Sequence, residues 1–137
     1  MRRVVADEYE IDDDRGRIDV DAVHAYLSTV YWARGRSREA VADTIATAAR
    51  VVGVYRQAEQ VGFARVISDR QTTCMLFDVY VLPEHRGRGL GIALVSAAVD
   101  ADPALADLKW VLHTRDMHRL YERFGFHAPS ERVMERG

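Results

Sequence analysis

The chain has 137 residues, 48% of them hydrophobic and 29% charged, and its 19 basic and 21 acidic residues leave a net charge of −2. These values indicate a single domain over residues 1–137 with enough apolar side chains for a core, and they argue against a disordered chain. The charge balance argues against binding to nucleic acid, and no apolar run approaches the roughly 18 residues of a membrane span. Because the N-terminus has no apolar segment of signal-peptide length, we expect a cytoplasmic protein.

The first third of the chain predicts one strand and two helices. Residues 7–12 (DEYEID) have the composition of a short strand. Apolar residues then recur at helical spacing after Asp19, which is suited to cap the N-terminus of a helix over residues 19–32. Ser37 is placed to open a second helix over residues 38–49.

Three β-rich segments follow. Residues 51–56 and 60–68 are separated by a few polar residues and predict a hairpin. Residues 75–82 (MLFDVYVL) form a longer apolar run, which is typical of a central strand covered on both faces. The single cysteine, Cys74, excludes an internal disulfide and is best explained as a small buried side chain.

Asp78 is the one charged residue of this apolar run. Strand alternation places its side chain on the face opposite those of Phe77 and Val79. A buried carboxylate is costly unless it is hydrogen-bonded or used, so Asp78 is a candidate for accepting a proton or binding a cationic substrate. A structural bond to a neighbouring group is the alternative, and the sequence leaves both open.

The C-terminal half predicts two helices and two strands. Residues 90–101 are apolar nearly all round and predict a buried helix, and residues 109–114 predict a strand. A short helix over residues 118–124 is closed by a glycine, and residues 130–135 predict a final strand. The complete order predicts an α/β (α+β) fold with a mixed central sheet and helices on both faces.

The segment PEHRGRGLG (83–91) lies between the apolar strand and the apolar helix. A dinucleotide fingerprint would require glycine where the chain has Ile92, and the Gly-Lys-Ser/Thr ending of a P-loop is absent. What remains is an R-x-x-G-x-G pattern formed by Arg86, Gly89 and Gly91. Glycines before a helix N-terminus leave converging N–H groups, which favours anion binding over a tight turn with solvated arginines.

This loop follows DVYVLPEH, and KWVLHT and LYERFGF follow it at fixed distances. Together these segments resemble the GNAT superfamily of acyl-CoA-dependent N-acyltransferases, and the order of strands and helices fits over essentially the whole chain. In that family R-x-x-G-x-G is the pyrophosphate loop and L-Y-E-x-F-G-F is a second hallmark. The resemblance implies the GNAT fold, in which the strands at 75–82 and 109–114 splay apart and admit the pantetheine arm of the coenzyme.

The resemblance also implies acetyl-CoA as co-substrate. Backbone groups of Val79 and Val81 would pair with the pantetheine amides, and the backbone of 86–91 would hold the pyrophosphate. Thr114 and Asp116 stand near the place of a family asparagine that this chain lacks. The implied coenzyme-binding residues are Val79, Tyr80, Val81, Arg86, Gly87, Arg88, Gly89, Leu90, Gly91, Thr114 and Asp116.

Two residues are the catalytic candidates that the resemblance implies. Tyr121 matches the family tyrosine that protonates the leaving thiolate, and a packing tyrosine is the alternative. Asp78 stands where several members carry an acidic residue that takes the proton of the amine. The five histidines do not group at metal-ligand spacing, so we expect no metal.

The acceptor pocket of such proteins is usually built from the first two helices and their loop, here residues 29–37. Tyr31 and Trp32 are candidate walls, with Asp78 inside, although Tyr31 in the core is an equal alternative. Three arginines of this region could attract an acidic group, or could simply be solvated: they are Arg34, Arg36 and Arg38.

The sequence therefore predicts a small bacterial N-acetyltransferase that acts on a primary amine, most simply of a small molecule. A protein or peptide N-acetyltransferase and a non-catalytic acyl-CoA-binding module are the alternatives. Dimers are common in the family, and nothing in the sequence selects between a monomer and a homodimer.

Overall fold

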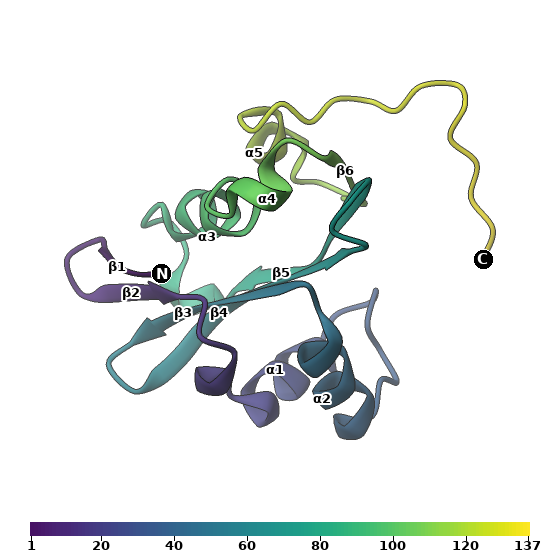
Figure 1. Ribbon diagram of the computed structural model, residues 1–137. Coiled ribbons are helices and arrows are strands. Elements are labelled where there is room, and N and C mark those ends of the chain that lie inside the picture. The colour runs from purple at the N-terminus through teal and green to yellow at the C-terminus, as the bar shows by residue number, and fades with distance from the viewer.

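A six-stranded mixed sheet runs through the centre of the computed structural model, which describes residues 1–137 (Figure 1). Its strands are β1 (Arg2–Val5), β2 (Tyr9–Asp12), β3 (Arg50–Arg56), β4 (Glu59–Ser68), β5 (Thr73–Val81) and β6 (Lys109–Leu112). The strands lie in chain order, and all neighbours are antiparallel except β5 and β6, which are parallel. The mixed sheet predicted from the sequence is therefore confirmed.

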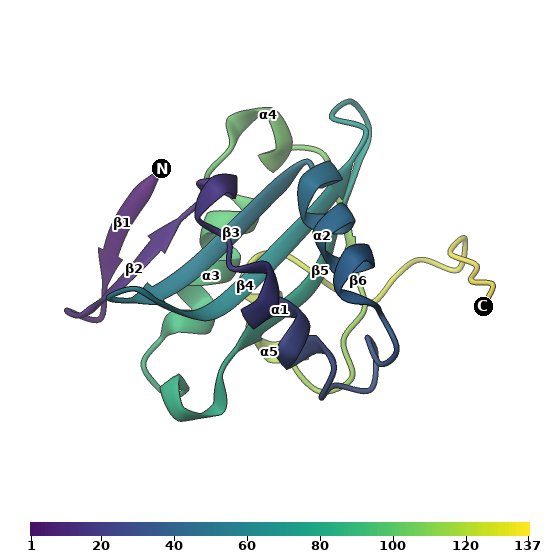
Figure 2. The ribbon, with the colours of Figure 1, turned by 90° about the horizontal axis from the view of Figure 1, so that it is seen from below.

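Helices cover both faces of the sheet, as predicted. They are α1 (Val20–Leu27), α2 (Arg38–Thr47), α3 (Leu90–Val99), α4 (Pro103–Ala106) and α5 (His118–Glu122). α1 and α2 lie on one face, and α3, α4 and α5 lie on the other (Figures 1 and 2). A separate apolar cluster fills each layer, with Leu94 of α3 in one and Val23 and Val41 of α1 and α2 in the other.

The two helices of the first layer start where the sequence predicted. The side chains of Asp19 and Ser37 each accept an N–H from the first turn of their helix at 3.0 Å. α1 is shorter than the predicted helix over 19–32. It ends at Leu27, and the Ser28 hydroxyl turns back to donate to a carbonyl of the last helical turn before the chain continues in turns.

β5 and β6 separate after a short parallel contact. Their pairing stops at Leu76 and Leu112, whereas β5 continues to Val81 and remains paired with β4 as far as Gly62. The C-terminal half of β5 therefore has a free edge on the side of β6. This is the splay of parallel strands that the resemblance predicted.

A β-bulge interrupts β5 at Asp78, whose φ of 55° lies in the left-handed region. Phe63 pairs with Tyr80 and Arg65 pairs with Phe77, so β5 has one residue more than β4 between these pairs. The extra residue shifts the alternation, and Asp78 and Phe77 both contact Arg65 on the face that carries α1 and α2. The predicted placement of Asp78 opposite Phe77 is wrong, because regular alternation does not include a bulge.

Two predicted strands differ from the structure. Residues 7–12 contain β2, the second half of a hairpin with β1, whose turn has positive φ at Ala6 and Asp7. Residues 130–135 form no strand, and the chain beyond α5 extends from the body without regular structure (Figure 1). Met134 there is 93% exposed, because its charged neighbours leave no continuous apolar face that could pack on the sheet.

The remaining predicted segments match their elements to within two residues at each end, but α4 was not predicted. Pro103 occupies the first turn of α4, and the Asp102 carboxylate accepts the Ala104 N–H at 3.0 Å. Pro103 thus opens a short helix as well as ending the previous one. None of the helices, including the strongly apolar α3, has the length and hydropathy needed to cross a bilayer.

Candidate active site

The loop that joins β5 to α3 presents unused backbone N–H groups. Gly87 and Gly89 have φ angles of 82° and 76°, which suit glycine, and a Cβ at either position would meet no atom within 4 Å. None of the N–H groups of residues 87–92 donates a hydrogen bond within the protein. They lie at the N-terminus of α3, where the helix dipole also favours negative charge. The loop is therefore suited to bind an anion such as a diphosphate.

The two arginines of the loop contribute differently from the glycines. Arg86 donates from Nε to the Val81 carbonyl at 2.8 Å and from Nη2 to the Tyr26 hydroxyl at 2.9 Å. Its side chain thereby ties the loop to β5 and α1 and leaves anion binding mainly to the backbone. Arg88 is exposed, with its guanidinium 5.9 Å from the centre of the Tyr9 ring, so it adds charge at the surface.

The free edge of β5 offers peptide groups beside this loop. The Leu82 N–H donates to the Val61 carbonyl on β4 at 2.8 Å. Because peptide groups alternate in direction along a strand, those of Val79 and Val81 point away from β4 and toward the gap that β6 leaves. The bond from Arg86 to the Val81 carbonyl agrees with this direction. An extended ligand can therefore pair with β5 like an added strand.

A cleft of about 460 Å³ joins the loop, the free edge of β5 and α5. Its lining residues are Tyr26, Trp32, Val79, Tyr80, Val81, Arg86, Gly87, Gly89, Leu90, Gly91, Ile92, Asp116, Met117, Leu120 and Tyr121. The structure thus brings together most of the predicted coenzyme-binding residues, from β5 through the loop to α3. Arg88 and Thr114 are the two that do not line the cleft.

Tyr121 of α5 lies in the wall of this cleft and is 8% exposed. Its hydroxyl has no hydrogen-bond partner in the protein and is not among the atoms sealed from solvent, so it faces the open space. Burial raises the pKa of the Tyr121 phenol above its ordinary value, because the phenolate is the charged form. The group is therefore protonated at neutral pH and available as a proton donor.

Thr114 and Asp116 precede α5 and have separate positions. The Thr114 hydroxyl oxygen accepts the Met117 N–H at 3.0 Å and so orders the start of α5, which carries Tyr121. Asp116 lines the cleft. Thr114 therefore supports the start of α5, and Asp116 reaches the cleft.

Asp78 is held by two arginines on the face that carries α1 and α2. Its carboxylate accepts from Arg36 Nη1 at 2.8 and 3.0 Å, one distance to each oxygen, and from Arg65 Nε at 2.9 Å. The Asp78 side chain is 1% exposed and does not line the cleft, although the next residue, Val79, does. The structure thus shows this carboxylate bonded to side chains of the protein. A structural bond of this kind was one of the alternatives that the sequence left open.

The loop between α1 and α2 contributes the far wall of the cleft. Trp32 lines the cleft, whereas Tyr31 is 57% exposed and packs edge-on against Trp32 with 5.5 Å between ring centres. The Arg115 guanidinium lies 4.9 Å from the centre of the Tyr31 ring and connects this loop to the segment before α5. Of the two predicted substrate walls, Trp32 therefore lies at the cleft and Tyr31 lies behind it.

The histidines lie outside the lining of the cleft. His85 is buried, and its Nδ1 is 2.8 Å from the Tyr9 hydroxyl, while His113 Nε2 lies 3.4 Å from the Glu135 carboxylate. No group of three or more His, Cys, Asp or Glu side chains is arranged to hold a metal ion.

Comparison with protein families decides the assignment that this geometry suggests. A family model described as an acetyltransferase (GNAT) domain matches residues 47–128, which include β3 to β6, the anion-binding loop and α5. The chain belongs to the GNAT acetyltransferases. Its enzyme class is therefore that of an acyltransferase, and the family uses acetyl-CoA as co-substrate.

Individual relatives agree with this assignment. FG08082 of Gibberella zeae, named as an acetyltransferase, is 30% identical over 86% of this chain and 78% of its own length. The peptidyl-lysine N-acetyltransferase YjaB of Salmonella typhimurium is 34% identical over 65% of this chain and 57% of its own length. A crystal structure of a Xanthomonas campestris protein assigned to the GNAT family is 39% identical, with a TM-score of 0.88 and coverage of 94% of this chain and 92% of that one.

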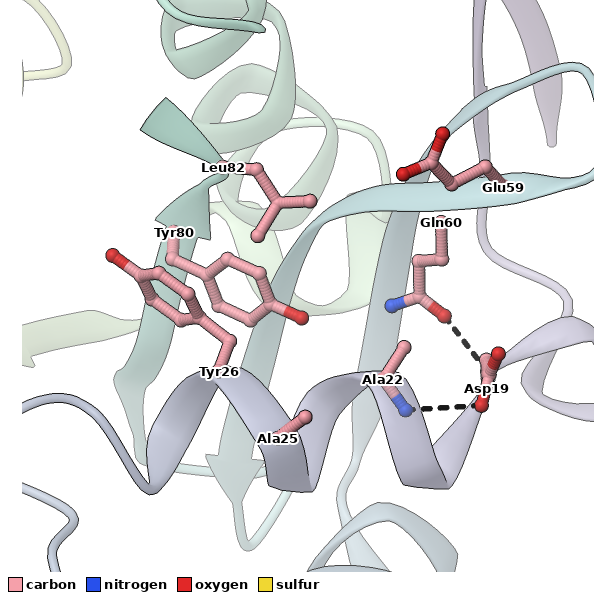
Figure 3. Close-up of a pocket in the computed structure, with 8 residues that line it drawn as sticks. All are labelled: Asp19, Ala22, Ala25, Tyr26, Glu59, Gln60, Tyr80 and Leu82. Carbon is pink, nitrogen blue, oxygen red and sulfur yellow. Dashed lines mark hydrogen bonds between the residues drawn. The ribbon is translucent and has the colours of Figure 1, made fainter. Parts of the chain in front are cut away.

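This GNAT chain has a second cavity, of about 390 Å³, which two stacked tyrosines line (Figure 3). Tyr26 of α1 and Tyr80 of β5 stack with 4.1 Å between ring centres, and both residues line both cavities. At the far end, the Gln60 side-chain oxygen accepts the Asp19 N–H at 2.7 Å. The tyrosine pair is therefore a shared wall that fixes α1 against the bulged half of β5.

Several residues of the GNAT cleft were missed by the sequence analysis. Tyr26 was assigned only to a helix, although its hydroxyl accepts from Arg86 and its ring stacks on Tyr80. Met117 and Leu120 lie beside Tyr121 in the cleft wall and carry no motif of their own. Outside the cleft lining, the role of Arg65 was detectable, because a lone arginine in an apolar segment requires an acidic partner.

Proposed function

We propose that this GNAT acetyltransferase transfers the acetyl group of acetyl-CoA to the primary amine of a small molecule. The observation that carries the proposal is that one cleft combines three features. It has the unpaired N–H groups after β5, the free edge of β5 and the unpartnered hydroxyl of Tyr121. Anion binding, strand-like pairing and proton donation are the three tasks that acyl transfer from coenzyme A requires at adjacent points.

Coenzyme binding divides between the loop and the strand. The N–H groups of residues 87–92 bind the diphosphate, and the outward peptide groups of Val79 and Val81 pair with the pantetheine amides. The Val79 N–H lies at the bulge and donates to the thioester carbonyl, where negative charge develops during the attack. Gly87 and Gly89 leave the space that the phosphates need, because a Cβ there would point into an empty region.

The chemical step forms a C–N bond and breaks the C–S bond of the thioester. The amine attacks as the free base and afterwards loses a proton to water. Tyr121 donates its phenolic proton to the departing sulfur and recovers a proton from solvent. The raised pKa of Tyr121 keeps this proton in place until the thiolate leaves.

Asp78 has a positioning role in this proposal. Both of its oxygens already accept hydrogen bonds from guanidinium groups, so the carboxylate has little capacity left to take a proton from the amine. Its bonds instead fix the bulge that orients Val79. The earlier role of Asp78 as a base or direct substrate ligand is therefore the less favoured alternative.

Lysine side chains of peptides are the second candidate acceptor. The relative YjaB is named a peptidyl-lysine N-acetyltransferase, and a lysine ammonium is also a primary amine. Trp32 lines the cleft, and we expect its bulk to favour a small acceptor. Both acceptors use the same residues for the chemical step.

The test is a continuous assay of thiol release from acetyl-CoA, with small primary amines and lysine-containing peptides as acceptors. We expect faster release with small amines and a kcat about 100-fold lower for Tyr121→Phe, because general acid catalysis contributes on this scale. The dissociation constant of acetyl-CoA should stay the same in the variant. Tyr55→Phe is the matched control, since it removes a phenol hydroxyl that has no hydrogen-bond partner and does not line the cleft.

Three results would contradict parts of the proposal. An unchanged kcat in Tyr121→Phe would eliminate the acid role. Release with peptides alone would replace the small amine by a protein acceptor. Binding of acetyl-CoA without release to either class of acceptor would leave a coenzyme-binding module.

A further inference from the structure

The cluster around the bulge contains more positive than negative charge. Arg36, from the loop before α2, and Arg65, from β4, share the single carboxylate of Asp78. The side chains of Arg65 and Asp78 are 8% and 1% exposed, and that of Arg36 is 26% exposed. One buried carboxylate therefore faces two guanidinium groups, and the cluster carries a net charge of about +1.

The two guanidinium groups keep unused donors. Arg36 uses only Nη1 and Arg65 uses only Nε in hydrogen bonds within the protein. The Tyr55 hydroxyl is the one buried side-chain atom that is both sealed from solvent and unpartnered, so the remaining guanidinium nitrogens are at least partly accessible to solvent. These free N–H groups can therefore donate to an acceptor that a ligand supplies.

Chain neighbours of the cluster line the cleft, although Arg36, Arg65 and Asp78 do not. Asp78 directly precedes Val79, and Arg36 lies four residues after Trp32, both of which line the cleft. The N–H groups for the coenzyme diphosphate lie at the start of α3, on the opposite face of the sheet from α1 and α2 (Figure 1). The excess positive charge is therefore on the face of α1 and α2, away from the N–H groups proposed for the coenzyme phosphates.

We infer that Arg36 and Arg65 bind a carboxylate of the acceptor, so that the substrate is a short amino acid with a free carboxyl group. This inference rests on the proposed function. A carboxylate has one negative charge, which matches the excess of the cluster, whereas a phosphate monoester would bring nearly two. Guanidinium groups bind carboxylates through paired, charge-assisted hydrogen bonds. Because the arginines hold Asp78, the residue directly before Val79, we expect only a few bonds between the carboxylate and the amine of the acceptor.

The experiment compares amino acids with their amides. Glycine, β-alanine and a longer ω-amino acid are each assayed beside the corresponding amide. The amide has the same length and an amine, but it lacks the negative charge of the carboxylate. The measured quantity is the ratio of kcat/KM for acid over amide, and it is compared between variants so that differences in amine basicity cancel. We expect Arg36→Gln to lower this ratio by about tenfold to a hundredfold, because each charged hydrogen bond contributes on that scale.

Two further variants separate recognition from folding. Arg36→Lys keeps the charge and loses the planar pair of donors, so the ratio should fall less than in Arg36→Gln. Arg56→Gln removes an exposed arginine that pairs with Glu8, and the ratio should stay unchanged. Circular dichroism and the acetyl-CoA dissociation constant show whether each variant is folded. If Arg36→Gln does not fold, the comparison between the wild-type protein and Arg36→Lys still tests the carboxylate site. A lower ratio of kcat/KM for acid over amide in Arg36→Lys supports the site, and an equal ratio overturns it.

The outcomes distinguish this inference from the proposed function. Equal ratios in the wild-type protein and Arg36→Gln, with active transfer to amides, would overturn the carboxylate site and keep the acetyltransferase with a small amine acceptor. Transfer to neither acids nor amides would overturn the small-molecule function and this inference with it. A ratio that falls in the order wild type, Arg36→Lys, Arg36→Gln supports the site.

Discussion

The two ends of the cleft are built from different parts of the chain. The coenzyme end consists of backbone N–H groups within one short loop, with glycines that leave room for a ligand. The site proposed for the acceptor consists of side chains from distant positions, in which Arg36, Arg65 and Asp78 meet at a bulge and do not line the cleft. The first end depends on local conformation and open space, whereas the second depends on compensation of buried charge. Substitutions at the two ends should therefore fail in different ways.

The largest expected effect is at the coenzyme end. Gly89→Asp should abolish detectable binding of acetyl-CoA, because the new carboxylate would enter the open space beside the N–H groups and repel the phosphates. Aspartate tolerates positive φ better than most residues, so the fold should survive. The measurement is calorimetric titration with acetyl-CoA. Gly35→Asp is the matched control, since Gly35 also has positive φ and open surroundings but lies at the acceptor loop. Retained affinity in Gly89→Asp would contradict the anion site.

The acceptor end should show its largest effect in stability. Asp78→Asn leaves two guanidinium groups without a charged partner and should lower the free energy of unfolding by about 3 kcal/mol. Urea denaturation measures this quantity. Asp21→Asn is the control, because Asp21 pairs with Arg38 at the surface with 74% side-chain exposure, and its loss should change the stability by less than about 1 kcal/mol. Equal losses of stability in the two variants would mean that Asp78 does not compensate the charge of Arg36 and Arg65.

These two predictions separate what the sequence could reveal from what it could not. The glycine loop and the LYERFGF segment were recognisable because local backbone demands leave a local pattern, and the helix starts at Asp19 and Ser37 were predictable for the same reason. The splay of β5 from β6 came from the resemblance. The partners of Asp78 were not predicted, because they come from a loop and a strand far along the chain.

The pairing of Arg65 with Asp78 was detectable in the sequence. Arg65 is the one charged residue of the predicted strand over residues 60–68, Asp78 is that of the run 75–82, and they have opposite signs on neighbouring strands of the sheet. This pattern predicts an ion pair. Regular alternation still places Asp78 on the wrong face, since a positive φ at an aspartate leaves no reliable trace in the sequence. The unpaired segment after α5 was also missed, because two adjacent apolar residues were interpreted as a strand.

A smaller effect should distinguish the acceptor wall from the coenzyme end. Trp32→Ala enlarges the cleft and should raise the KM of the acceptor by about tenfold, because a large aromatic contact is lost. The acetyl-CoA dissociation constant should not change. Steady-state kinetics beside calorimetry measure both quantities. Tyr31→Ala is the control behind the wall and should have a weaker effect, and a larger effect there would reverse the order of the two aromatic residues.

The smallest expected effect is in the pH dependence of kcat, which should stay nearly flat with Tyr121 as the proton donor. Burial raises the pKa of its phenol above 10.0, so the protonated form persists as the pH rises. With an acceptor amine of low pKa, which stays neutral, kcat should change less than about twofold between roughly pH 7 and 9. The measurement is a pH profile of kcat. A decline with a midpoint below pH 9 would indicate a different proton donor.

We propose that the free edge of β5 and the loop before α3 together form one coenzyme site. The most direct test is calorimetric titration of the wild-type protein with acetyl-CoA beside adenosine diphosphate. We predict binding of one acetyl-CoA per chain, much tighter than adenosine diphosphate, since only acetyl-CoA pairs with β5 as well as with the loop. Equal affinity for the two would eliminate the strand edge from the site, and no binding of acetyl-CoA would contradict the account as a whole.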